Sequence, residues 1–172
     1  MLIELNTFYL QTASKMYTFG NQFNFNFLNK QFRCNCPITS ALDILGDKWT
    51  LTLIKLMLVE GRKTFKDFLE SKEAISSNIL SDRLKMMEEY NIIIKKSAPN
   101  NKKSNFYLLT EKGLDLTPTL VEITLWSDRN VREYHPTLMP EEKIAVIKKN
   151  KSQYINSLIE NYKKQNEPVE GM

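Results

Sequence analysis

The chain has 172 residues, of which 42% are hydrophobic and 26% are charged, and its formal net charge is +4. These values are typical of a folded domain with extensions, and the few glycines and prolines argue against flexible linkers and turn-rich β architectures. The mild positive charge permits a polyanionic partner but does not require one. No apolar run reaches the roughly 18 residues of a membrane span, and the N-terminus lacks a secretory signal pattern. We therefore expect a cytoplasmic protein with no membrane partner.

Residues 1–33 form a first region in which aromatic side chains are interleaved with asparagine and glutamine. The segment 23–27 alternates with the two-residue period of a strand, yet no partner strand is evident. Three interpretations stay open: an arm that packs on a partner subunit, a disordered and aggregation-prone tail, or a true start at Met16.

Residues 34–134 have the pattern of a small, mainly helical domain. Gly46 and Gly61 follow apolar periodic runs, as helix-ending glycines do, and Asp47 is placed to cap the second helix. Thr64 and Asp67 resemble a capping box. Helices are expected, in chain order, over 37–45, 48–60, 65–71 and 77–90.

The helix at 77–90 has an apolar inner face and a small polar outer face. Leu80, Leu84 and Met87 recur at the spacing of one helical face, and Ser76 can cap the first turn by accepting a backbone N–H bond. The shorter helix before it, joined by a break near 72–75, completes the pattern of a helix-turn-helix. An ordinary solvated amphipathic helix is the alternative.

A two-stranded hairpin should follow this helix pair. The runs 92–96 and 106–109 favour strands, and a loop with Pro and Asn turn chemistry is expected at 97–104. Between Lys95 and Lys103 the chain carries four lysines and no acid. Such a basic hairpin is typical of a wing that contacts phosphates without reading sequence, although a solvated loop would have the same composition.

Two helical regions complete the expected elements. The first covers 111–133, and Pro118 should kink or restart it. Its apolar stripe, formed by Leu120, Ile123 and Trp126, suits packing on a second subunit, on the chain's own first helices, or on both. Residues 135–172 should form one amphipathic helix, about 141–164, and a short disordered tail. This helix would either extend a dimer interface or cover the domain.

Several short motifs stand in a fixed order along the chain. They are Cys36-Pro37, Gly-Asp-Lys-Trp-Thr at 46–50, Ile-Leu-Ser-Asp-Arg-Leu at 79–84, Leu-Thr-Glu-Lys-Gly at 109–113, and Trp126. Together they resemble the HxlR-type winged helix-turn-helix transcriptional regulators of bacteria and archaea. The resemblance covers about 34–134, and Asp82 departs from it, because a neutral polar or basic residue is commoner at that position.

The resemblance implies a fold, a function and an assembly. The fold is mainly α (α+β): a winged helix-turn-helix with a two-stranded hairpin and additional N- and C-terminal helices. The function is that of a homodimer that binds operator DNA, with the 77–90 helix in the major groove and the 95–104 hairpin on the flanking backbone. The first and last helices of the winged domain would form the dimer interface.

The DNA-binding candidates come from the outer face of the 77–90 helix, the hairpin, and the start of the preceding helix. They are Thr64, Lys66, Ser76, Ser77, Asn78, Ser81, Arg83, Lys85, Lys95, Lys102 and Lys103. Asn78 is suited to bidentate contact with adenine, whereas the hairpin lysines should add affinity alone. For Arg83, a phosphate contact and an ion pair inside the domain stay equally open.

Cys36 is a candidate redox-sensing residue, with Cys34 as a second thiol. A helix N-terminus stabilises a thiolate, and some members of the family that the chain resembles sense oxidants or electrophiles at this position. An inert interface cysteine is the alternative. Two cysteines and the lone His135 give no recognisable metal-ligand spacing, so we expect no metal and no cofactor.

The sequence therefore predicts a homodimeric, sequence-specific regulator of transcription, with a repressor as the expected sign of regulation. Two-fold symmetry implies a double-stranded inverted-repeat operator with half-sites about one helical turn apart. Its effector, if it has one, would be an unidentified small molecule or oxidant. A winged-helix module for protein contact, without DNA binding, is the alternative. An enzyme is disfavoured, because the chain has no phosphate-binding glycine loop and no nucleophile elbow.

Overall fold

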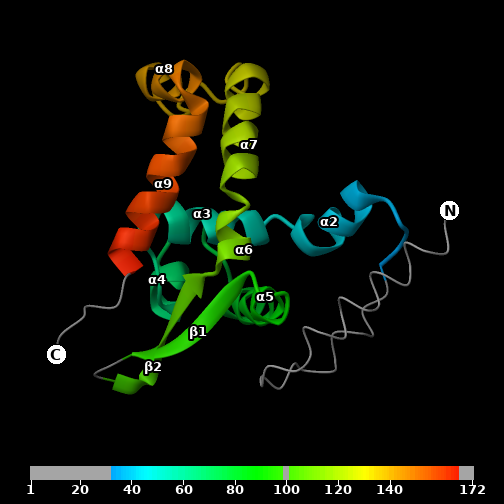
Figure 1. The fold of residues 1–172 in the computed structure, drawn as a ribbon, viewed down its shortest axis with the longest axis vertical. Helices are drawn as coiled ribbons and strands as arrows, with labels where there is room; N and C mark the ends of the chain where they lie inside the picture. The colour runs from blue at the N-terminus through cyan, green and yellow to red at the C-terminus, as the bar shows by residue number, and fades with distance from the viewer. Residues whose placement is uncertain (1–31, 99–100, 167–172) are drawn as a thin grey trace, which may run out of the picture. The chain divides into compact units, whose positions relative to one another are not determined.

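The computed structural model describes residues 32–98 and 101–166, with side chains described at neither 98 nor 101–104. The proposed N-terminal arm, up to residue 31, lies outside the described residues, as do the last six residues of the chain (167–172). Figure 1 shows the arrangement of the elements. In chain order they are α2 (Pro37–Leu45), α3 (Thr50–Glu60), α4 (Phe65–Leu69), α5 (Ser77–Glu89), β1 (Ile93–Ala98), β2 (Asn101–Leu109), α6 (Glu111–Leu114), α7 (Thr117–Asn130), α8 (Glu141–Lys149) and α9 (Lys151–Asn166).

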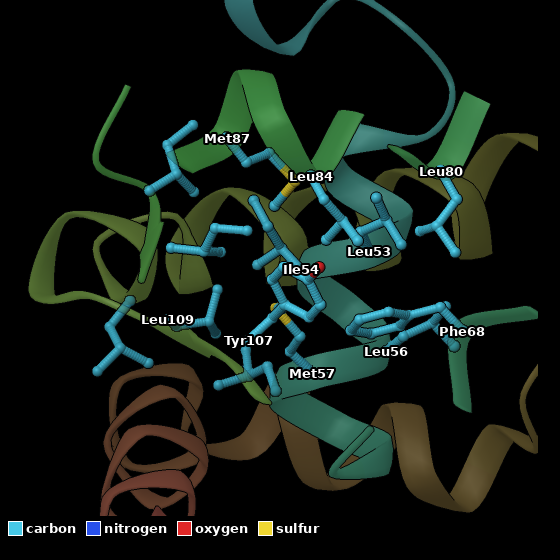
Figure 2. Packing of buried hydrophobic residues seen from close by; sticks show 14 of the residues in the cluster. Leu53, Ile54, Leu56, Met57, Phe68, Leu80, Leu84, Met87, Tyr107 and Leu109 are labelled. Carbon is cyan, nitrogen blue, oxygen red and sulfur yellow. The ribbon is translucent and has the colours of Figure 1, made fainter. Parts of the chain in front are cut away.

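Helix α3 is the centre of the main hydrophobic core. Its sequence is apolar around most of the helix, which is the pattern of a fully buried helix rather than a surface one. Leu53, Ile54 and Leu56 are completely buried. Figure 2 shows the side chains of α5, including Leu84 and Met87, next to those of α3, with β2 approaching from another side. The position of each remaining element around the core therefore depends on which side of α3 it covers.

The helix ends around α3 follow the predicted capping residues. Gly61 ends the helix in the left-handed conformation, with φ of 65°, where a side chain would be strained. Asp47 accepts hydrogen bonds from the backbone N–H groups of Trp49, at 2.7 Å, and Thr50, at 3.0 Å. The helix begins at Thr50 rather than at Lys48, because Asp47 satisfies these first N–H groups from an irregular turn.

The helix-turn-helix is formed by α4 and α5. Thr64 and Asp67 form the predicted capping box, and α4 ends at Leu69, two residues earlier than expected. In the turn, Ala74 adopts a φ of 53°, which is unusual for a residue with a side chain. The predicted capping bond of Ser76 was wrong: Ser76 precedes α5, but its hydroxyl accepts no capping hydrogen bond.

The wing is a longer ladder than the sequence suggests. Strands β1 and β2 pair antiparallel from Ile93 opposite Leu109 to Ala98 opposite Asn101, with an irregularity after Ser97. The loop prediction at 97–104 was therefore wrong over most of its length, because backbone pairing continues beyond the apolar residues. The base of the wing is also fixed to the start of the helix-turn-helix, since the Tyr107 N–H donates to the Lys63 carbonyl at 2.8 Å.

Pro118 restarts the chain rather than kinking one long helix. It lies in the first turn of α7, where a missing N–H costs nothing, and α6 is a separate short helix. The prediction of a single helix at 141–164 was wrong, because α8 and α9 are separated at Asn150. Its backbone is extended, and its side chain accepts from the Gln153 N–H at 3.1 Å, which starts the second helix.

Helix α9 packs along α7 and then against α3 and the wing (Figure 1). Val121 and Leu125 of α7 form a second apolar cluster with α8, joined to the main core through Leu158. Near the end of α9, Tyr162 is only 5% exposed, and its hydroxyl accepts from the Leu109 N–H at 2.7 Å. The C-terminal region therefore covers the domain, which was one of the two interpretations of the sequence.

Removing the Tyr162 hydroxyl should destabilise the chain. In Tyr162→Phe the buried Leu109 N–H loses its acceptor, so we expect the free energy of unfolding to fall by about 1–3 kcal/mol. Urea unfolding would measure it. Tyr154→Phe is the matched control, because Tyr154 is half-buried and its hydroxyl has no hydrogen-bond partner among the described residues. Equal stability of the two variants would contradict a structural role for this bond.

Candidate nucleic-acid interface

The outer face of α5 carries small polar side chains and a lysine. Ser77, Asn78, Ser81 and Lys85 are all exposed, as the sequence predicts. Within residues 32–98 and 101–166, none of these side chains makes a hydrogen bond or an ion pair. Ser76 is also exposed, and its hydroxyl is not used as a cap. This face therefore offers uncommitted donors and acceptors to a partner.

Arg83 links α5 to the start of α3. Its Nη1 lies 3.2 Å from Oδ2 of Asp47, whose carboxylate also accepts from the Thr50 hydroxyl at 2.5 Å. Of the two roles open for Arg83, the structure places it in the ion pair inside the domain. The pair links α5 to the start of α3, while the buried stripe of Leu80, Leu84 and Met87 sets which face of α5 points outward.

The same arrangement keeps Asp47 ionised. Partial burial raises the pKa of Asp47, but hydrogen bonds from Thr50 and Trp49 and the charge of Arg83 outweigh it, so the pKa lies below its ordinary value. Because the folded pKa is depressed, this contribution to stability is present at neutral pH and is lost as the pH falls through the folded pKa.

The candidates at the start of the helix-turn-helix have different surroundings. The Thr64 hydroxyl accepts from the Asp67 N–H at 3.1 Å, so it serves as the cap of α4. Lys66 is exposed, and its Nζ lies 3.6 Å from a carboxylate oxygen of Glu70, one turn later. An exposed pair of this kind is weak, so Lys66 stays free to exchange Glu70 for a phosphate.

The wing carries exposed lysines on its first strand. Lys95 and Lys96 are exposed on β1, which lies beside α5 (Figure 1). Lys102 and Lys103 belong to β2, and their side chains are outside the described set. The described wing lysines are therefore solvent-exposed on the strand that neighbours α5.

Besides Glu88 and Glu89 near its end, α5 exposes two residues outside the predicted set. Ile79 is 39% exposed although it is apolar, and Asp82 is exposed one turn later. The sequence contains a signal for Ile79: it lies off the inner stripe of Leu80, Leu84 and Met87, so burial in the core does not explain an isoleucine there.

Cys36 stands at the N-cap of α2, and both Cys36 and Cys34 are exposed and reduced. The backbone and side chain of Thr39, followed by the backbone of Ile38, stabilise a thiolate and lower the pKa of Cys36 below its ordinary value. The thiolate fraction at neutral pH is therefore larger than that of a free cysteine.

Large apolar side chains are exposed on α2 and α7. No residue of α2 is buried, and its Ile38 and Leu42 are exposed. On α7, Ile123 is 44% and Trp126 56% exposed, whereas Leu120 packs against the chain's own core. Of the three residues predicted to face a second subunit, Leu120 is therefore partly used within the chain, and the other two are available.

The described part of the chain lacks the features of two other classes of site. No helix there is long and apolar enough to cross a membrane. No group of three metal-ligating His, Cys, Asp or Glu residues occurs among the same residues.

The sequence and the fold were compared with known proteins. A family model described as HxlR-like helix-turn-helix matches residues 44–135. The chain is 35% identical over 109 residues to the HTH-type transcriptional regulator YodB of Bacillus subtilis, a match that covers 63% of this chain and 96% of that protein.

Two solved structures resemble this chain in both fold and sequence. PA1607 is 31% identical with a TM-score of 0.52, covering 57% of this chain and 67% of that one. The redox regulator HypR, in its reduced form, is 27% identical with a TM-score of 0.51, covering 58% of this chain and all of that one.

Helices α8 and α9 lie beyond the matched family region. The family match, the YodB similarity and the winged fold together establish that this chain belongs to the HxlR-like helix-turn-helix family of transcriptional regulators, not to a family of enzymes.

Proposed function

We propose that the chain is a homodimeric repressor that binds an inverted-repeat operator, with α5 in the major groove and the β1–β2 wing on flanking phosphates. The observation that supports this most is the outer face of α5. Its small polar side chains are exposed and uncommitted, while its inner face is buried and Arg83 is fixed to Asp47. A rigid helix with free donors is what base-edge readout requires.

Dimerisation would use the exposed apolar residues of α2 and α7. Ile38 and Leu42 on α2, and Ile123 and Trp126 on α7, are large apolar side chains left in solvent. Apolar surface of this kind marks interaction sites, and the family resemblance implies that these helices pair across a two-fold axis. Two copies of α5 would then enter successive major grooves, about 34–36 Å apart.

The first prediction concerns DNA affinity. The full chain should select one motif from a random duplex pool and bind it at least about 10³-fold more tightly than a shuffled duplex. Asn78→Ala should reduce binding of the selected duplex by about 10-fold and leave the shuffled duplex unchanged, because Asn78 reads a base. Lys95→Ala should weaken both and lower the salt slope by about one, because it contacts phosphate. Fluorescence anisotropy across a salt series measures all three.

The matched control is Lys143→Ala on α8, which removes the same charge from an exposed side chain outside the helix-turn-helix and wing. It should leave both affinities unchanged. If the wild-type chain enriches no motif and binds every duplex weakly without salt dependence, the module has lost DNA binding. The protein-interaction alternative would then be favoured.

We also propose that Cys36 makes the regulator responsive to oxidants. The supporting observations are its exposure, its place at the start of α2, and its lowered pKa. HypR, a similar protein, is named a redox regulator. Cys34 and Cys36 are separated by one residue and would not bridge easily. Oxidation would instead join thiols of two subunits, with the oxidant accepting two electrons and two protons, and would change the geometry of the paired α2 helices.

The second prediction tests this thiol. Treatment with the thiol oxidant diamide should lower wild-type affinity for the selected duplex by about 5- to 150-fold, as expected for a coupling of about 1–3 kcal/mol, and a reducing agent should restore it. Cys36→Ser should be insensitive, whereas Cys34→Ser, the matched control, should respond like the wild type if the bridge joins two Cys36 residues. A Cys36→Ser variant as sensitive as the wild type would refute the switch.

A further inference from the structure

Asp82 is an acidic residue on the outward surface of the recognition helix. It is exposed, and in the described part of the chain it has no hydrogen-bond or ion-pair partner. Neither neighbouring cation neutralises it: Arg83 pairs with Asp47 instead, and Lys85 forms no ion pair with it. The carboxylate would therefore enter a DNA groove as an uncompensated negative charge.

A carboxylate in the major groove is repelled by phosphates unless a base donates to it. Two bases carry an amino group there, adenine at N6 and cytosine at N4. In adenine the acceptor N7 lies beside N6 and would face the second carboxylate oxygen, whereas cytosine presents its amino group without an adjacent acceptor of its own. Asp82 is thus chemically matched to cytosine.

The neighbours of Asp82 extend this match. Lys85 follows by three residues on the same exposed surface, so its ammonium can donate to the O6 and N7 acceptors of a guanine. The Asp82 acceptor and the Lys85 donor together complement a C·G pair, in which cytosine donates and guanine accepts. Ile79 precedes Asp82 by three residues and is 39% exposed, which places an apolar surface beside the carboxylate. The apolar feature of the major groove is the thymine methyl group.

We propose that Asp82 accepts a hydrogen bond from N4 of an operator cytosine, with Lys85 on the paired guanine and Ile79 against the methyl group of a neighbouring thymine. This assignment rests on the proposed function, since it requires α5 to enter the major groove. It makes Asp82 a specificity-determining residue. Its negative charge weakens binding to DNA in general, and a hydrogen bond from a cytosine amino group offsets that repulsion at the operator.

The test is selection from a random duplex pool by the full wild-type chain and by Asp82→Asn. The wild-type motif should contain a C·G pair in each half-site, and replacing it with T·A should lower affinity by about 10-fold. Asp82→Asn should change the preferred pair at that position to A·T, because an amide donates to N7 and accepts from N6 of adenine. Ile79→Ala should remove the preference for thymine at the neighbouring position only.

Glu88→Gln is the matched control, because it removes the same charge from an exposed position two turns further along the same helix. It should raise affinity for all duplexes without altering the motif. If Asp82→Asn behaves in the same way and keeps the wild-type motif, Asp82 acts only by repulsion and the assignment is overturned, while the proposed function stands. If the wild-type chain enriches no motif, the proposed function itself fails. Because Asp82 is exposed, equal thermal unfolding of the variants would confirm that folding is not the cause.

Discussion

The burial of α3 is the constraint on which the rest of the structure depends. Helix α3 is apolar around most of its circumference, so it needs cover on several sides, and α5, β2 and α9 each cover part of it. The apolar face of α5 and the base of the wing pack on α3, whereas α9 divides its apolar face between α3 and the α7–α8 cluster. The side chains of each covering element that do not pack in the core remain exposed to solvent. For α5, the remainder is the polar face that we assign to DNA.

Polar contacts then fix the covering elements in orientation. The Asp47–Arg83 pair joins the start of α3 to the middle of α5, and Asp47 is a residue of the family motif at 46–50. The wing is held at its base by the Lys63 carbonyl on one side and the Tyr162 hydroxyl on the other. The second contact comes from a helix outside the family region. The C-terminal extension therefore supports the wing, which also belongs to the family core.

Much of the fold follows from local sequence patterns, and the failures have physical causes. Gly61, the Thr64–Asp67 capping box and the apolar stripe of α5 act within one or two turns, so the sequence predicts them. The break at Asn150 was missed because the apolar period continues across it. The exposed outer face of α5 was predicted from periodicity, but the partner of Arg83 is a residue 36 positions away that no local pattern reveals. Ile79 was passed over because apolar residues in an amphipathic helix are read as core.

The central claim is that two copies of α5 occupy the major groove in a two-fold arrangement. Dimethyl sulfate protection tests it directly, because the reagent methylates guanine N7 in that groove. On the selected duplex, the account predicts protected guanines in two symmetric clusters about one helical turn, roughly 34–36 Å, apart. Protection of a single cluster would contradict the dimer, and tight specific binding without any N7 protection would contradict the placement of α5.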